Sequence, residues 1–147
     1  MEIGVRPASR ADVPTLLDLY AELHPGDRPP SAETARDVWR AIAAQAGRTV
    51  LVAESAGTVV GTVDCAVLPN LTRGARPFML VENVVVTAGH RRSGVGSALL
   101  AATVSLARQT GCYKVQLLSR AERHAAHAFY ESHGFRAVAQ GYRRYLD

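Results

Sequence analysis

The fold of this chain is decided by the stretch Val84-Val85-Val86-Thr87-Ala88-Gly89-His90-Arg91-Arg92-Ser93-Gly94-Val95-Gly96-Ser97. Its β-branched first residues predict a strand, which extends from Phe78 to Thr87. From Gly94 to Gln109 the apolar residues recur with helical spacing, which predicts a long helix. The first turn of a helix has N–H groups without a partner in the helix and carries the positive end of the helix dipole. The glycine-bearing turn before this helix therefore predicts a phosphate site.

Residues that this turn lacks exclude two common classes of phosphate-binding loop. Arg91 and Arg92 add positive charge, while Gly94 and Gly96 let a phosphate approach the backbone closely. A nucleoside-triphosphate loop ends in Gly-Lys-Ser/Thr, and this stretch has no lysine. A dinucleotide fingerprint needs a small residue where Leu99 stands, and it follows an N-terminal βαβ unit. For these residues alone, an ordinary glycine-rich turn without a ligand is an equal alternative.

The length and composition describe an ordinary globular protein. The chain has 147 residues, of which 48% are hydrophobic and 20% charged, which excludes intrinsic disorder and predicts a single domain over residues 1–147. No apolar run approaches the roughly 18 residues that span a bilayer, and the N-terminus lacks the apolar stretch of a signal peptide. The two cysteines are too far apart for a zinc-finger spacing. We therefore expect a cytoplasmic protein with no membrane partner and no metal.

The positive charge is carried almost wholly by arginine. The formal net charge is +4, and Lys114 is the only lysine. Arginine binds phosphate with a planar fork of donors, whereas nucleic-acid binding usually requires a clustered stripe of charge. The arginines are scattered here, apart from the pairs Arg91-Arg92 and Arg143-Arg144. The pattern favours a phosphorylated small ligand over a nucleic acid.

The rest of the chain alternates between the two periodicities. We expect a strand at 3–6, then a helix from Val13 to Leu23 capped by Ser9 or Asp12, and a second helix that follows Ser31 and ends near Gly47. A hairpin of two strands, 49–54 and 58–68, comes next. After the long helix we expect a strand at 115–119, a helix at 122–132, and short strands at 135–138 and 141–145. The hairpin favours antiparallel pairing, and the strand–helix–strand order that follows favours parallel pairing. The predicted fold class is α/β, with a mixed sheet of six to seven strands and helices on both faces.

Two short patterns in this frame carry a family resemblance. The run Arg91-Arg92-Ser93-Gly94-Val95-Gly96 matches the pattern Arg/Gln-x-x-Gly-x-Gly/Ala. About 35 residues later, Ala128-Phe129-Tyr130-Glu131-Ser132-His133-Gly134-Phe135 contains Tyr-x-x-x-Gly-Phe. Both patterns, in this order and with this arrangement of elements, resemble the GNAT superfamily of acetyl-CoA-dependent N-acetyltransferases. The resemblance covers nearly the whole chain and is sharpest over residues 78–135.

The resemblance implies a splayed sheet that holds acetyl-CoA between the strands 78–87 and 115–119. The pantetheine arm would pair like an added strand with the backbone of Val84, Val85 and Val86. The pyrophosphate would lie on the N–H groups of Arg91, Arg92, Ser93, Gly94, Val95, Gly96 and Ser97. Many family members have a cofactor-binding asparagine seven residues before the tyrosine. Arg123 stands at that position here, and an arginine would still reach the cofactor.

The resemblance also implies direct transfer of an acetyl group from a thioester to an amine. Glu82, nine positions before Arg91, resembles the glutamate base of some members, and its apolar neighbours are expected to desolvate it. Tyr130 is the candidate acid, because a phenol and an alkyl thiol have similar acidity. The structural alternatives are an ion pair for Glu82 and core packing for Tyr130. Rival bases are His24, His90, His124, His127 and His133, and a backbone N–H near Val84 or Val85 would stabilise the oxyanion.

The acceptor is the least determined part of the prediction. The segments expected to face it are 24–31, 68–77 and 140–145. Their arginines favour an acidic acceptor, whereas Asp27, Asp64 and Glu82 favour a cationic one, and neither group prevails. The predicted function is acetyl-CoA-dependent N-acetylation of a small-molecule primary amine. The alternatives are a protein or peptide N-acetyltransferase and a non-catalytic acyl-CoA-binding module, and a homodimer is left open.

Overall fold

The computed structural model describes residues 2–147. The chain divides into two compact units, of which the first ends at Gln116 and the second runs from Leu117 to Asp147. The single domain predicted over residues 1–147 stays a prediction.

The sheet has five strands in the order β1-β2-β3-β4-β5. The strands are β1 (Ile3–Pro7), β2 (Arg48–Ser55), β3 (Thr58–Leu68), β4 (Phe78–Val86) and β5 (Val115–Leu117). The first four strands pair in antiparallel fashion. A helix connects β4 to its neighbour β5, which is the connection typical of parallel strands, so the sheet is mixed. The β2–β3 turn has Ala56 and Gly57 at φ +52° and +80°, the backbone that a tight hairpin requires.

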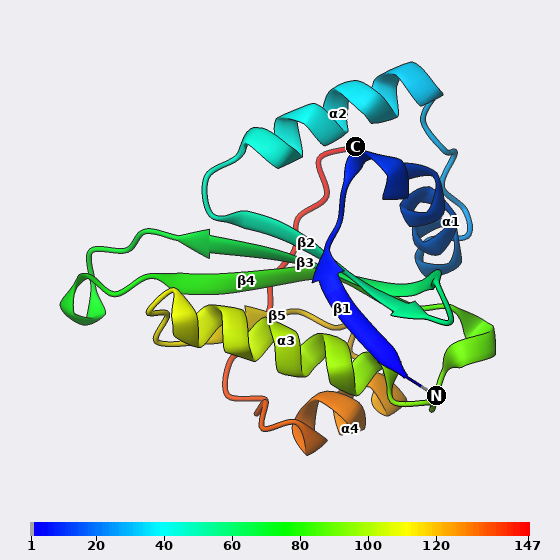
Figure 1. Ribbon diagram of the computed structural model, residues 1–147. Helices are drawn as coiled ribbons and strands as arrows, with labels where there is room; N and C mark the ends of the chain where they lie inside the picture. The colour runs from blue at the N-terminus through cyan, green and yellow to red at the C-terminus, as the bar shows by residue number, and fades with distance from the viewer. Residues whose placement is uncertain (1) are drawn as a thin grey trace. The chain divides into compact units, whose positions relative to one another are not determined.

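Helices cover both faces of this sheet, as Figure 1 shows. The helices α1 (Val13–Leu23) and α2 (Ala32–Ala44) lie on one face, and α3 (Val95–Gln109) lies on the other. On the first face, Leu16 packs against Val50 and Val52 of β2, with Trp39 of α2 beside them. On the second face, Gly61 lets α3 come close, since a Cβ there would lie 3.0 Å from side-chain atoms of Val95 and Leu99. The predicted α/β class is confirmed.

The start and end of the first two helices follow from local chemistry. Ser31 accepts a hydrogen bond from the Thr34 N–H at 3.1 Å and caps α2, as its position before the helix predicts. The expected stop at Gly47 lies three residues beyond the last residue of α2. Gly47 instead has φ +79° in the turn into β2, and its carbonyl accepts from the Val67 N–H at 2.7 Å.

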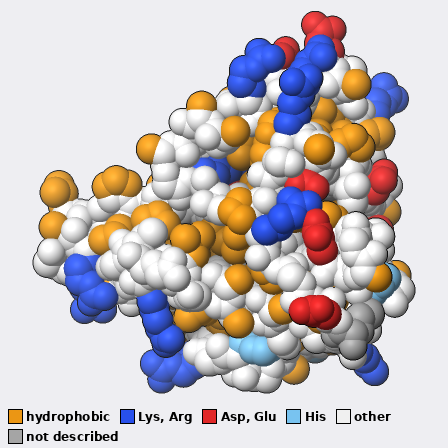
Figure 2. Space-filling model, in the orientation of Figure 1, with side chains coloured by type: hydrophobic (Ala, Val, Ile, Leu, Met, Phe, Trp, Pro, Cys, Tyr) orange, Lys and Arg blue, Asp and Glu red, His pale blue; other side chains and the backbone are white. Residues whose placement is uncertain are grey.

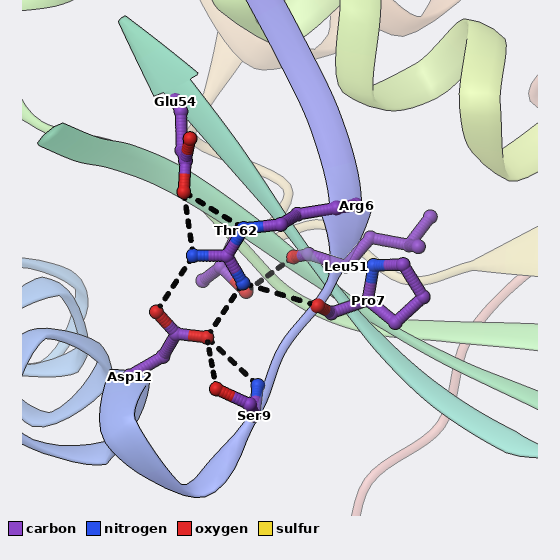
Figure 3. Close-up of polar contacts among 7 residues, drawn as sticks. All are labelled: Arg6, Pro7, Ser9, Asp12, Leu51, Glu54 and Thr62. Carbon is purple, nitrogen blue, oxygen red and sulfur yellow. Dashed lines mark hydrogen bonds and ion pairs between the residues drawn. The ribbon is translucent and has the colours of Figure 1, made fainter. Parts of the chain in front are cut away.

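A partly buried polar network fixes the start of α1 to the sheet (Figure 3). Arg6 of β1 donates to both carboxylate oxygens of Asp12, at 2.8 and 3.0 Å, and its Nε donates to Glu54 of β2 at 2.7 Å. Asp12 also accepts from the Ser9 N–H at 2.7 Å. Asp12 forms the end of the short 3₁₀ turn η1 (Arg10–Asp12) and is the N-cap residue of α1. Strand β1, strand β2 and helix α1 are therefore held at one point.

The second unit contains α4 (His124–Ser132) and an extended C-terminal segment. The strands predicted at 135–138 and 141–145 are not formed, so the sheet has five strands instead of six or seven. The side chains of Val138 and Tyr142 are 78% and 85% exposed. The alternating residues have the composition of strands, but strand preference depends on packing against a neighbouring strand, and this segment pairs with none within the described residues.

Charged groups and helix lengths bear on the predicted partners. On the face drawn in Figure 2, Lys and Arg side chains lie in separate groups among acidic and uncharged ones. Over residues 2–147, no helix combines the length and the apolar character needed to cross a bilayer. The absence of nucleic-acid and membrane partners stays a prediction.

Candidate active site

The end of β4 contains a β-bulge. Thr62 of β3 pairs with Val85, but Asp64, two residues later, pairs with Glu82, so β4 has one extra residue in this interval. Asn83 takes up that residue with a left-handed backbone, φ +53°. A bulge leaves the extra residue out of the ladder and re-aims the backbone around it. The bulge lies directly before Val84, in the segment where the sequence predicts pairing with pantetheine and an N–H donor for the oxyanion.

Within the part of the chain that the structure describes, the short strand β5 leaves most of one edge of β4 without a partner strand. Backbone bonds beside the β4–β5 ladder lie at the start of β4, where the Met79 N–H donates to Lys114 O at 3.1 Å and the Tyr113 N–H donates to Pro77 O at 3.0 Å. Three strand residues span about 10 Å, a third of a nine-residue strand. The segment Val84–Val86 therefore lies beyond the reach of β5.

The loop after β4 turns sharply into α3, as the phosphate-site prediction requires. It contains the 3₁₀ turn η3 (Ala88–His90), and Arg92 and Gly94 then have φ +61° and +88°. Gly94 is the N-cap of α3, and it offers no side chain to accept from the first-turn N–H groups. Such left-handed residues beside a helix start produce a concave array of backbone donors that suits an anion.

The charged side chains of this loop differ in their surroundings. The Arg91 Nε donates to Val86 O at 3.1 Å, so the end of β4 orients its guanidinium, which is 58% exposed. Arg92 is exposed. Ser93 donates from its hydroxyl to the His90 carbonyl, which closes the loop on itself. The sequence therefore identified the two arginines beside the helix start, and the structure leaves both accessible.

Glu22 of α1 is a contact of this loop that the sequence did not reveal. Its carboxylate accepts from the Thr87 hydroxyl at 2.7 Å and from the Ala88 N–H at 3.0 Å. The hydrogen bond from Thr87 is the main cause that lowers the pKa of Glu22. The partners are 65 and 66 residues apart in the sequence, so no local pattern could have predicted them.

The candidate base Glu82 is exposed, which corrects the expected desolvation. Its neighbour Val81 is buried, because side chains alternate between the two faces of a strand. Within residues 2–147, Glu82 forms no ion pair, so the alternative of a bound arginine is not found there. Asp64, opposite Glu82 on β3, is 5% exposed and binds Arg48 at 2.6 Å. Asp64 is therefore unavailable to a cationic acceptor, contrary to the expectation.

A small pocket lies at the C-terminal half of α1. It has a volume of about 170 Å³ and is lined by Leu17, Tyr20, Ala21, Asp27, Arg28, Pro29 and Pro30. Residues 27–30 of this lining belong to the segment 24–31 that the sequence expects to face the acceptor. Burial, together with the nearby charge of Asp64, raises the pKa of Tyr20 to about 12. The Tyr20 hydroxyl hydrogen-bonds with Thr62 of β3, a contact that the helical spacing of Tyr20 among apolar residues did not reveal.

In the second unit, Tyr130 is buried near the end of α4. Its ring packs edge-on against Phe135 at 6.0 Å between centroids, and the Phe135 N–H donates to Tyr130 O at 3.1 Å. Gly134, with φ +86°, lets the chain fold back in this way. Burial raises the pKa of Tyr130, and the charge of Arg123, the N-cap residue of α4, opposes the shift. The Tyr130 phenol is therefore protonated at neutral pH, and its raised pKa makes it a weaker acid than an exposed phenol.

The five histidines have varied surroundings. His127 hydrogen-bonds with Arg120 O at 2.7 Å, and the His133 ring lies 4.8 Å from that of Phe129. His124 lies edge-on to His127, while His24 is exposed. His90 has a buried Nδ1 that meets no hydrogen-bond partner within the described chain. Among residues 2–147, no group of three His, Cys, Asp or Glu residues could hold a metal ion.

The model of the acetyltransferase (GNAT) family matches residues 13–135. This range contains the bulged strand, the loop with its left-handed residues, α3 and α4. The chain belongs to the acetyltransferase (GNAT) family, and it is an acyltransferase. The family uses acetyl-CoA as its co-substrate.

Individual relatives span different shares of the chain. A solved structure from Agrobacterium tumefaciens superposes with a TM-score of 0.94 at 38% identity, over 97% of this chain and 99% of that one. Glucosamine 6-phosphate N-acetyltransferase of Trypanosoma brucei brucei is 40% identical over 81 residues, which is 55% of this chain and about half, 53%, of that relative. Aminoglycoside N(6')-acetyltransferase type 1 of Stenotrophomonas maltophilia is 28% identical over 90% of this chain and 88% of that one.

Proposed function

We propose that this protein transfers an acetyl group from acetyl-CoA directly to a primary amine of a small molecule. The observation that carries the proposal is the continuous path from the bulge at Asn83 to the left-handed N-cap Gly94 of α3. Along this path, an edge of β4 is followed by a concave turn of backbone donors with two accessible arginines. A molecule that joins an amide-bearing arm to a diphosphate matches both halves of the path.

The cofactor would bind mainly through the backbone. Val84, Val85 and Val86 would pair with the pantetheine amides as a neighbouring strand does. The N–H groups from Arg91 to Ser97 would hold the pyrophosphate, with charge from the Arg91 and Arg92 side chains. Arg123 is proposed as a further contact of the cofactor from the second unit.

Three groups would divide the chemistry between them. Glu82 takes a proton from the acceptor ammonium, through a water molecule, and the amine then attacks the thioester carbonyl carbon. The N–H near Val84 stabilises the negative charge that develops on the carbonyl oxygen. As the carbon–sulfur bond breaks, Tyr130 gives its proton to the departing thiolate, and the nitrogen of the new amide loses its surplus proton to water. The products are the N-acetyl amide and free CoA thiol, and both side chains regain their protonation states from solvent.

Exposure of Glu82 is consistent with this role. A base that works through water needs contact with solvent, and Glu82 is not committed to an ion pair in the described chain. Tyr130 is proposed for the opposite task, because its phenol is protonated at neutral pH and a phenol and an alkyl thiol have similar acidity; burial, which raises its pKa, opposes this role in part.

The acceptor is proposed to be an amino sugar or a similar polar amine. The pocket beside α1 is lined by Tyr20 together with the charged residues Asp27 and Arg28. This combination suits a molecule with hydroxyls, an ammonium group and an anionic substituent. Two relatives that the chain matches are named for glucosamine 6-phosphate and for aminoglycosides, both of which are amino sugars or contain them.

The test is release of CoA thiol from acetyl-CoA in the presence of a panel of amines. The panel holds amino sugars with and without a phosphate, aminoglycosides, polyamines, amino acids and peptides, and mass spectrometry identifies each acetylated product. We expect turnover with an amino sugar and loss of that turnover in Asp27→Asn or Arg28→Gln. Turnover confined to peptides would overturn the small-molecule acceptor, and binding of acetyl-CoA without any turnover would overturn catalysis.

A further inference from the structure

Helix α1 is fastened to the loop that follows β4 by one carboxylate. Glu22 accepts from the Thr87 hydroxyl through Oε2 and from the Ala88 N–H through Oε1. Its Oε1 also lies 3.8 Å from a terminal nitrogen of Arg91. All four residues belong to the first unit. The three contacts bring one side chain of α1 to the start of the loop proposed to bind diphosphate.

The chemistry of the contact explains why a carboxylate serves here. Ala88 is the first residue of η3, so its N–H has no acceptor within the turn and needs one from elsewhere. Glu22 supplies that acceptor and also accepts a hydrogen bond from the Thr87 hydroxyl. Bonds to an ionised acceptor are the strong class of hydrogen bond. The carboxylate thus fixes the first two residues after β4.

A carboxylate at this position also has an electrostatic disadvantage. Its negative charge lies close to Arg91, which is proposed to meet the diphosphate, and it lowers the positive potential of that site. Hydrogen bonding would therefore favour cofactor affinity, whereas charge would oppose it. The two effects have opposite signs, so different substitutions of one residue can separate them.

We propose that Glu22 is a positioning residue for the cofactor loop, which it holds through Thr87 and Ala88 so that the donors from Arg91 onward are presented to the diphosphate. This role rests on the proposed function. Glu22 touches neither the acceptor pocket nor the reacting atoms, so its effect falls on cofactor affinity and not on the chemical step.

The experiment compares two substitutions by calorimetric titration with CoA. Glu22→Ala removes both hydrogen bonds, and we expect its Kd for CoA to rise about 3- to 30-fold. Glu22→Gln keeps an acceptor for the Ala88 N–H and removes the charge, so we expect its Kd to equal or fall below that of the wild type. In steady-state assays, the Ala variant should raise KM for acetyl-CoA and leave kcat within about twofold.

A matched pair of controls tests the placement of the charge. Asp18 is an exposed carboxylate four residues earlier on α1, and within the described chain it forms no ion pair. Asp18→Ala and Asp18→Asn should leave the Kd for CoA unchanged. Thr87→Val removes the hydroxyl that Glu22 accepts from. If the two residues act together, the Kd for CoA of the double variant Glu22→Ala/Thr87→Val should rise by less than the product of the two single-variant increases.

The outcomes separate the two proposals. Wild-type protein that produces no heat with CoA overturns both the proposed function and this role. Wild-type binding that Glu22→Ala leaves unchanged, or that Glu22→Gln weakens as much as Glu22→Ala, overturns the positioning role alone. If Glu22→Ala does not fold, Thr87→Val decides the matter, because an unchanged Kd in that variant also contradicts the proposal.

Discussion

Replacement of Asp12 by asparagine should cost the fold a defined, pH-dependent amount of stability. The Asp12 side chain is 9% exposed and accepts two hydrogen bonds from Arg6 and one from the Ser9 N–H. The bonds from Arg6 are the main cause that lowers the pKa of Asp12 from 3.8 to about 2. Because one pKa unit corresponds to about 1.4 kcal/mol, the ionised carboxylate contributes about 2 kcal/mol to the free energy of unfolding at neutral pH.

The sign of the pH dependence follows from the lowered pKa. The unfolded chain binds this proton more tightly than the folded chain, so the stabilisation is fully present above about pH 4 and is lost as the pH falls towards about 2. Asp12→Asn should therefore be less stable than the wild type by about 2 kcal/mol at pH 7, and the difference should narrow by about 1 kcal/mol near pH 3.

Urea unfolding at the two pH values measures both quantities. Asp37→Asn is the matched control, because Asp37 lies in an exposed pair with Arg40 at 3.7 Å, and exposed pairs contribute little. We expect that control to match the wild type at each pH. The reasoning is refuted if Asp12→Asn is as stable as the wild type at pH 7, or if its deficit is the same at both pH values.

Three further predictions concern the site and the turns. Tyr130→Phe should lower kcat about 100-fold or more while leaving the Kd for CoA within about threefold, and equal losses in both would argue against the acid role. Because the pKa of Tyr130 is raised, the activity of the wild type should fall only at a pH above the pKa of an ordinary phenol. Glu82→Gln should lower kcat/KM about 100-fold or more while leaving the Kd for CoA within about threefold, whereas Glu33→Gln, on the exposed first turn of α2, should keep the wild-type kcat/KM; an unaltered kcat/KM in Glu82→Gln would exclude it as the base. Gly47→Ala should destabilise the protein by more than Gly57→Ala, although both have φ near +80°, because only the Cβ at Gly47 would lie 2.3 Å from a carbonyl oxygen; equal melting temperatures would contradict the packing there.

The parts of the fold that the sequence predicted are those with local signals. The β-branched run of β4 and the helical spacing of α3 identify both elements and the turn between them, because each pattern is complete within about fifteen residues. The family patterns also have a local physical basis, since Gly94 and Gly134 both have the left-handed backbone that glycine adopts readily. The turn and the end of α4 could therefore be located without a structure.

The parts that the sequence did not predict depend on distant partners. Residues 141–145 have the alternation of a strand, but strand formation needs a neighbour that sequence patterns do not reveal. Asp64 gave no sign of its pairing with Arg48 across the β2–β3 hairpin. The left-handed Asn83 is a bulge only in relation to the register of β3. The sequence thus identified the candidate residues, while their exposure and their partners came from the fold.

The most direct test of the account is the response of individual backbone amides to CoA. Titration of isotopically labelled protein with CoA, followed by amide NMR spectra, reports each N–H from β4 to the first turn of α3. We expect the largest changes in amide chemical shift at Val84–Val86 and at Arg91–Ser97, with small changes in the β2–β3 turn. CoA that binds with its largest shifts elsewhere, and leaves the amides of 91–97 unmoved, would contradict it.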